Sequence, residues 1–262
     1  MSPADSGKEA VDDLVLTDSL QTALSPDEVH VWIADLDSYL PDNFERLLSI
    51  DEVQRAHRFH FAKHRNHFVV ARGLLRKLLA AYLACNPAEL KFEYAAKGKP
   101  SVAAAHAIKF NLAHSHGQAA YAFSRNRELG IDIELMRQDF GGEDIARRFF
   151  STHEVQCLET VAKDLAGQAF FNCWTRKEAY IKAIGEGLSM PLEAFDVSLA
   201  PGEPAALLQN RLNEREVERW SMQSLTAPDG YAAALVVEGS GWNFKQFTLQ
   251  GSAKPDRAIA IE

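Results

Sequence analysis

Two acids lie in a short apolar segment, and their spacing is the first indication of chemistry in this sequence. Asp132 and Glu134 belong to the segment GIDIE at 130–134, where they alternate with Ile131 and Ile133. Side chains on a strand alternate between faces, so the two carboxylates point the same way. Mg²⁺ prefers carboxylate oxygens as ligands. The segment therefore predicts either a strand edge that holds a divalent cation or a solvated strand face.

A third acid lies on a predicted helix, in the stretch WTRKEAYIKAIGEGL at 174–188. Glu178 and Lys182 are four residues apart, so they share one face of that helix. One interpretation is a surface ion pair, which contributes only about 0.3–0.5 kcal/mol. The other makes Glu178 a further metal carboxylate or a general base, with Lys182 as a general acid or a phosphate clamp.

Two further stretches place polar groups at the ends of predicted strands. In FNLAHS at 110–115, His114 and Ser115 come just before Gly117. In AAKGKPS at 95–101, a turn exposes Lys99, because Pro100 fixes the backbone beside it. Taken alone, each stretch is also an ordinary turn.

Positive charge is concentrated in one part of an otherwise acidic chain. The net charge is −8, which argues against a general nucleic-acid binder. Between residues 53 and 88 there is no Asp or Glu, and the segment carries seven basic residues: Arg55, Arg58, Lys63, Arg65, Arg72, Arg76 and Lys77. Such a segment predicts a local site for an anion, such as a phosphate-bearing ligand, or else a solvated helix face.

The remaining composition predicts a cytoplasmic protein that does not bind membranes. The first residues show no basic segment followed by an apolar one, and no apolar run approaches the roughly 18 residues that a membrane helix needs. The three cysteines share no metal-ligand spacing, so we expect reduced thiols.

The periodicity of the chain indicates an α+β fold built from two similar halves. Predicted strands cover 28–36, 91–96, 107–115, 118–124, 129–135, 194–200, 215–225, 230–237 and 242–249. Predicted helices cover 41–48, 49–59, 67–84, 144–150, 151–161 and 167–187, with capping boxes at Ser49/Glu52 and Ser151/Glu154.

The order of strand, helices, long helix and strands then occurs twice. We therefore expect a flexible N-terminal tail (1–27), an N-terminal α/β half (28–126), a C-terminal α/β half (127–250) and a C-terminal tail (251–262). The halves should be related by pseudo-two-fold symmetry, with a ligand cleft between them.

The order of the motifs FNLAHS, GIDIE and WTRKEAYIKAIGEGL resembles that of the 4′-phosphopantetheinyl transferase family. The resemblance is to the larger, pseudo-dimeric type that activates peptide, polyketide and fatty-acid synthases. It runs from about Val53 to Leu249, with GKP at 98–100 and RRFF at 147–150 also in place. It implies an Mg²⁺-dependent enzyme, with Mn²⁺ as a possible substitute, that moves the phosphopantetheine arm of coenzyme A to a serine of an apo carrier. The partners implied are an acyl carrier protein or peptidyl and polyketide carrier domains, and the fused halves suggest a monomer.

The resemblance also implies roles for individual residues. The magnesium carboxylates would be Asp132, Glu134 and Glu178. Glu178 would also be the base for the incoming serine, Lys182 would assist at the departing phosphate, and His114 would contact the phosphates of coenzyme A. The coenzyme A contacts would further include Lys99 at the nucleotide end and, near the 3′-phosphate, Arg58, Lys63 and Arg72. Ala113 departs from the family pattern, because many members have Ser there.

The implied reaction agrees with the physical character of these residues. Negative charge builds on the pyrophosphate oxygens, and a cation held by acids would stabilise it. The base could be Glu178 or a metal-bound water. Two other functions stay open: a coenzyme A-binding regulator without turnover, and a Mg²⁺-dependent hydrolase of nucleotide pyrophosphates.

Overall fold

The computed structural model describes residues 24–102, 107–137, 142–185, 187 and 190–251. The strands are β1 (Glu28–Asp35), β2 (Phe92–Tyr94), β3 (Pro100–Val102), β4 (Ile108–Ser115), β5 (Gln118–Arg125), β6 (Leu129–Leu135), β7 (Phe195–Val197), β8 (Leu207–Asn210), β9 (Trp220–Ser224), β10 (Tyr231–Glu238) and β11 (Asn243–Leu249). The α-helices are α1 (Asp42–Glu45), α2 (Ile50–His57), α3 (Ala62–Leu83), α4 (Gly142–Phe149), α5 (Thr152–Thr160), α6 (Ala166–Ile184) and α7 (Glu216–Arg219).

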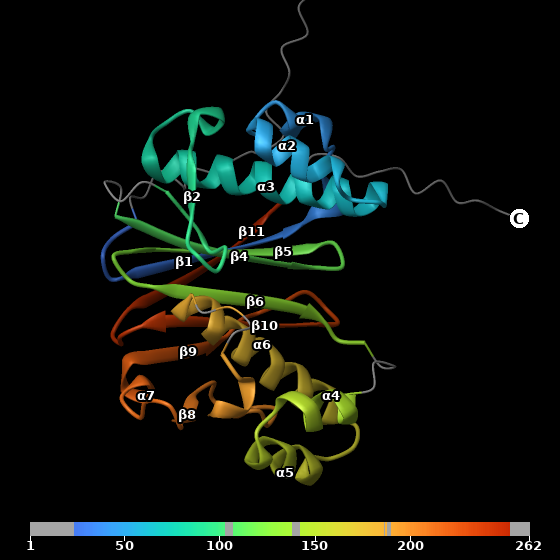
Figure 1. Cartoon of the computed structure of the whole chain (residues 1–262), viewed down its shortest axis with the longest axis vertical. Helices are drawn as coiled ribbons and strands as arrows, with labels where there is room; N and C mark the ends of the chain where they lie inside the picture. Colours follow the sequence, from blue (N-terminus) through green and yellow to red (C-terminus); the bar gives the residue numbers. More distant parts are fainter. Residues whose placement is uncertain (1–23, 103–106, 138–141, 186, 188–189, 252–262) are drawn as a thin grey trace, which may run out of the picture.

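Two sheets pack face to face between two long helices, so the fold is of the mixed α/β kind (Figure 1). The first sheet has the order β11-β1-β5-β4, and the second has the order β6-β10-β9. Helix α3 covers the outer face of the first sheet and α6 covers the outer face of the second. Strand alternation explains the layers: Val29, Val31 and Ile33 of β1 enter the cluster between the sheets, while Trp32 and Ala34 face α3.

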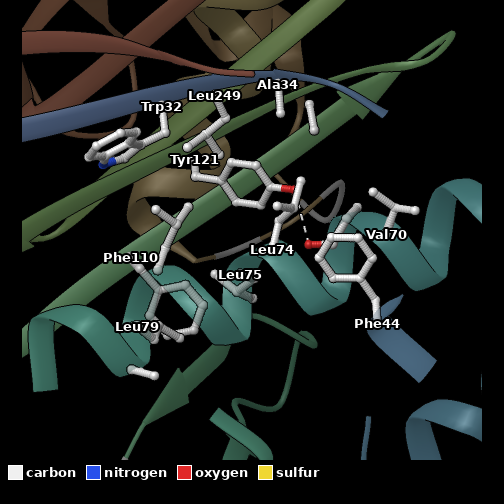
Figure 2. Packing of buried hydrophobic residues seen from close by; sticks show 14 of the residues in the cluster. Trp32, Ala34, Phe44, Val70, Leu74, Leu75, Leu79, Phe110, Tyr121 and Leu249 are labelled. Atoms are coloured by element: carbon white, nitrogen blue, oxygen red, sulfur yellow. Dashed lines mark hydrogen bonds between the residues drawn. The ribbon is translucent and has the colours of Figure 1, made fainter. Parts of the chain in front are cut away.

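The core under α3 is built from one face of that helix. Figure 2 shows Leu74, Leu75 and Leu79 packed toward Tyr121 of β5 and Phe110 of β4, all of them buried. The apolar residues of this face recur at three- and four-residue spacing, as is typical of an amphipathic helix that packs on a sheet.

The sequence-based elements are largely confirmed, including both capping boxes, at Ser49/Glu52 and Ser151/Glu154. The predicted strand at 215–225 was wrong in its first half, which forms α7. There the side chain of Glu216 accepts a hydrogen bond from Trp220 Nε1 (2.6 Å) and stabilises a helical turn before β9. The short strands β3 and β8 were not predicted, because three or four residues show too little alternation to detect.

The predicted division of the chain does not coincide with the division into sheets. Strand β11 comes from the C-terminal half of the sequence, yet it pairs in parallel with β1 in the first sheet. The packed chain also includes Leu24, which is buried ahead of the expected start at Glu28. The rest of the two predicted tails, 1–23 and 252–262, lies outside the described residues.

No helix among the described residues has both the length and the apolar character required to cross a bilayer.

Candidate active site

Strand β6 carries two of the predicted acids along the edge of the second sheet. Ile131 and Ile133 are fully buried between the sheets, so the alternating Asp132 turns to the opposite face, toward α6. Asp132 is itself buried, whereas Glu134, two residues further along the strand, is half-buried. The expected alternation of apolar and acidic residues is therefore confirmed.

A glycine brings α6 close enough to β6 to form the site. A Cβ atom added at Gly130 would lie 2.1 Å from the carbonyl oxygen of Ala179 and 2.4 Å from the backbone nitrogen of Ala183. No side chain fits there, so glycine permits the helix backbone to rest directly on the strand. This contact places Glu178 and Lys182, which flank Ala179 and Ala183 on α6, next to Asp132.

Lys182 and three carboxylates share this region. Lys182 Nζ donates to Asp132 Oδ1 at 2.6 Å and lies 3.4 Å from the carbonyl oxygen of Ile131. The other oxygen of Asp132, Oδ2, is buried without a hydrogen-bond partner. Burial raises the pKa of Asp132 to about 7, and the charges of Glu134 and Glu178 contribute, although Lys182 opposes the shift.

Glu178 experiences the same environment. Burial raises its pKa, Lys182 lowers it, and the charge of Glu134 raises it. The charge of Glu134 therefore acts on both Asp132 and Glu178, and the charge of Glu178 acts on Asp132. In the described residues, however, no group of three or more His, Cys, Asp or Glu side chains is already arranged to hold a metal ion.

His114 joins the site from the first sheet. It lies on the exposed side of β4, one residue before the end of that strand. Partial desolvation lowers the pKa of His114, although much of the side chain is exposed, and the positive charges of Lys182, His67 and Arg55 lower it further. Arg55 of α2, His67 of α3 and Lys182 of α6 therefore lie within electrostatic reach of His114, which suits an anionic ligand.

The other predicted coenzyme A contacts occupy different settings. Arg58 and Lys63 are exposed, and Lys63 Nζ lies 3.7 Å from Asp37. Arg72 is buried, donates to Glu52 and to the hydroxyl of Tyr94, and stacks 4.1 Å over the ring of Phe92. Much of the Arg72 guanidinium is therefore already bound to residues of the N-terminal half.

Lys99 connects the two halves of the chain. Its ammonium donates to Glu128 Oε2 (3.1 Å), to the carbonyl of Leu129 (3.2 Å) and to the carbonyl of Ala183 (2.9 Å). It also lines a cavity of about 290 Å³ with Pro100, Lys109 and Gly185. The ammonium itself is engaged, so a ligand in this cavity would meet the side-chain stem and the neighbouring backbone.

Two residues next to the site were not predicted as members of it. Side chains of β4 accept hydrogen bonds from the backbone at the edge of β6. Asn111 Oδ1 accepts from the N–H of Ile131 (3.0 Å), and Ser115 Oγ accepts from the N–H of Leu135 (3.3 Å). Their spacing of four along β4 places them on one face, but only the packing of β4 against β6 shows what that face meets.

Comparisons with known proteins agree with one another. A family model described as the 4′-phosphopantetheinyl transferase superfamily matches residues 128–236, and one described as 4′-phosphopantetheinyl transferase, N-terminal, matches residues 41–125. The chain is 39% identical over 228 residues to the 4′-phosphopantetheinyl transferase HetI of Nostoc sp., covering 85% of this chain and 92% of HetI.

More distant relatives extend the same similarity. The chain is 29% identical over 158 residues to the 4′-phosphopantetheinyl transferase Sfp of Bacillus subtilis, covering 60% of this chain and 69% of Sfp. A human L-aminoadipate-semialdehyde dehydrogenase-phosphopantetheinyl transferase is 25% identical over 248 residues, with 86% and 80% coverage. Among solved structures, the holo-[acyl-carrier-protein] synthase of Thermotoga maritima matches 43% of this chain and 63% of its own at 21% identity, with a TM-score of 0.32.

Proposed function

Since this chain belongs to the 4′-phosphopantetheinyl transferase family and is an enzyme of that family, we propose which reaction its site performs. It transfers the 4′-phosphopantetheine arm of coenzyme A to a serine of an apo acyl, peptidyl or polyketide carrier protein. Adenosine 3′,5′-bisphosphate leaves, and the reaction depends on Mg²⁺. The observation that supports the proposal is the ion pair between Lys182 and the buried Asp132. The second oxygen of Asp132 has no hydrogen-bond partner, and the charges of Glu134 and Glu178 reach this carboxylate.

The donor chemistry of these acids fits a magnesium ion. All three offer carboxylate oxygens, and the buried Asp132 Oδ2 has no partner that satisfies it. A buried carboxylate that neighbours two others is stabilised by added positive charge, which the raised pKa of Asp132 also indicates. When bound, Mg²⁺ would supply charge stabilisation for the pyrophosphate oxygens. Asp132, Glu134 and Glu178 would hold it, and Mn²⁺, which also takes oxygen ligands, would substitute.

The surrounding side chains have complementary tasks. Glu178 acts as the base for the carrier serine, and in the metal-free site burial raises the pKa of its carboxyl. Lys182, whose side chain is 29% exposed, stabilises the charge on the departing phosphate. His114 contacts the phosphates of coenzyme A beside it.

The nucleotide end would lie between the two halves, which we propose are related by pseudo-two-fold symmetry. The cavity lined by Lys99 offers room there, and the side chains of Arg58 and Lys63 are exposed and can approach a 3′-phosphate. Arg72 would reach a phosphate only with N–H groups that are not already bound to Glu52 and Tyr94. The enzyme acts as a cytoplasmic monomer, and the exposed basic side chains of Arg55, Arg58, Lys63 and Arg65 suit an acidic carrier.

The test is the labelling of a purified apo carrier by a fluorescent coenzyme A analogue. Asp132→Ala and Glu178→Ala should each reduce the Mg²⁺-dependent rate by about a thousandfold or more, because each removes charge stabilisation or the base from the reacting centre. Chelation of divalent metal should abolish the reaction in the wild type. Glu218→Ala is the matched control, since Glu218 is an exposed acid on α7. Full labelling by either site variant would exclude the assignment.

The same assay separates the other two functions. A coenzyme A-binding regulator would bind coenzyme A tightly and label none of a panel of carriers. A hydrolase of nucleotide pyrophosphates would release adenosine 3′,5′-bisphosphate when no carrier is present.

A further inference from the structure

The hydroxyl of Ser115 contacts three polar groups beside the proposed metal acids. Ser115 is 7% exposed, at the end of β4. Its Oγ lies 2.7 Å from Glu134 Oε2, 3.3 Å from the backbone nitrogen of Leu135 and 3.0 Å from His116 Nδ1. It is thus a side chain of the first sheet that binds directly to an acid of the second.

The direction of these hydrogen bonds follows from the proton count. A hydroxyl has one proton to donate, an ionised carboxylate can only accept, and a backbone N–H can only donate. The Ser115 proton therefore goes to Glu134, and the N–H of Leu135 donates to Ser115 Oγ. His116 must then carry its proton on Nδ1 and donate it to Ser115 Oγ. Both donors point their hydrogens at Ser115, which strengthens its own bond to Glu134.

The turn that carries Ser115 and His116 is held from both halves of the chain. The hydroxyl of Tyr231 on β10 donates to the carbonyl of His116 at 2.8 Å, and the N–H of Leu36 donates to the carbonyl of Gly117 at 2.7 Å. His116 has a φ of 46°, a left-handed conformation that costs a non-glycine residue about 1 kcal/mol or more. A strained turn that is fixed at both ends places Ser115 accurately against β6.

We propose that Ser115 is a positioning residue that fixes the carboxylate of Glu134, with His116 setting the direction of the serine hydroxyl. The inference rests on the proposed function, because Glu134 is a proposed metal carboxylate. Glu134 is half-buried at the end of an edge strand, and Ser115 is the group that holds one of its oxygens. Without that bond the side chain gains rotamer freedom, and a cation must order it on binding.

The experiment compares four variants with the wild type by Mn²⁺ affinity, measured from the electron paramagnetic resonance signal of free Mn²⁺, and by transfer kinetics. Ser115→Ala removes the hydroxyl, and Ser115→Thr restores it on a β-branched residue that suits a strand. His116→Gly suits the positive φ and removes only the imidazole. Ser124→Ala is the matched control, since Ser124 is a fully buried serine on β5 whose hydroxyl donates to the carbonyl of Arg127 at 2.6 Å.

Ser115→Ala should weaken Mn²⁺ binding about tenfold, as the loss of an outer-shell partner typically does, and lower the transfer rate at limiting metal by a similar factor. The Michaelis constant for the carrier should stay unchanged. Ser115→Thr should recover most of the loss, and His116→Gly should show a loss of roughly two- to threefold, because it weakens only one polarising contact. Ser124→Ala should bind Mn²⁺ like the wild type, whatever its melting temperature.

Three results would overturn the proposal: wild-type Mn²⁺ affinity in Ser115→Ala, failure of Ser115→Thr to recover it, or an equal loss in Ser124→Ala. These differ from a failure of the proposed function. In that case the wild type itself would bind no Mn²⁺ at the site and would label no carrier.

Discussion

Helix α6 carries two lysines that each bind a carboxylate, and the two pairs differ in how completely they are satisfied. Lys177 lies 2.8 Å from Glu154, and neither side chain is exposed to solvent. Lys182 lies 2.6 Å from Asp132, with side-chain exposures of 29% and 4%. The chemistry and the distances are alike, and the lysines are only five residues apart on one helix.

Every partner in the Lys177 pair is accounted for. Lys177 also donates to the carbonyls of Leu192 (2.8 Å) and Phe195 (2.6 Å). Glu154 also accepts from the N–H of Ser151 (2.9 Å) and of Val197 (2.8 Å). The pair joins α5, α6 and β7, and its buried charges are stable because the backbone completes their hydrogen bonds.

The Lys182 pair is incomplete, since Asp132 Oδ2 has no hydrogen-bond partner. Burial, together with the charges of two more acids, raises the pKa of Asp132. A buried ion pair by itself therefore indicates nothing about function. A complete pair holds the fold together, whereas an incomplete one retains affinity for a further positive charge.

The largest effect on stability is expected for Lys177→Met. This change leaves Glu154 buried without its counter-ion, which costs about 3–5 kcal/mol in the free energy of unfolding. Urea unfolding followed by tryptophan fluorescence measures the loss. The double variant Lys177→Met/Glu154→Leu should recover part of it, because no unpaired charge remains. A loss below about 1 kcal/mol in the single variant would contradict the structural role, since exposed pairs contribute that little.

Lys182→Met should give the opposite pattern. We expect the transfer rate to fall by about a hundredfold, within the range for a residue that assists a leaving group. The free energy of unfolding should change by only about 1 kcal/mol, because Lys182 is partly exposed and Asp132 can take up a proton. Carrier labelling and urea unfolding are measured on the same preparation. Equal losses of stability in Lys182→Met and Lys177→Met would remove the distinction between the two pairs.

The smallest effect is a pH dependence of stability that arises from Asp132 when divalent metal is chelated. Its pKa is raised from 3.8 to about 7 on folding, so between these pH values the folded state binds more protons than the unfolded state. The free energy of unfolding should therefore fall as the pH rises from about 4 through 7. Asp132→Asn removes this decline and should be more stable than the wild type at pH 8, by about 1 kcal/mol or more. Parallel stability profiles for the two proteins would refute the raised pKa.

The helices and strands could largely be predicted from the sequence, and where the prediction was wrong the cause is local. The strand β6, the helix α6 and both capping boxes follow from alternation, helical spacing and side chains that bond three residues away. The turn α7 was mistaken for strand because its stabilising contact, from Trp220 to Glu216, depends on a side-chain direction that a residue pattern does not contain.

The candidate site was predicted as a set of residue types but not as a set of contacts. Arg72 and Lys99 belong to the predicted coenzyme A contacts, yet the structure engages both with protein oxygens. Ser115 was visible within FNLAHS, yet nothing in the sequence indicated that its hydroxyl would reach Glu134. These contacts join residues far apart in the chain, so no short pattern encodes them.

By itself the sequence determined the family, the acids that share strand β6, and the helix that carries Glu178 and Lys182, because spacing along a strand or helix decides which side chains share a face. Only the tertiary structure decided that β11 joins the first sheet, that β4 side chains bind the edge of β6, and that Lys177 holds the fold while Lys182 borders the site. The physical reason is that burial and the completeness of hydrogen bonding depend on every element packed around a residue, and these elements come from distant parts of the chain.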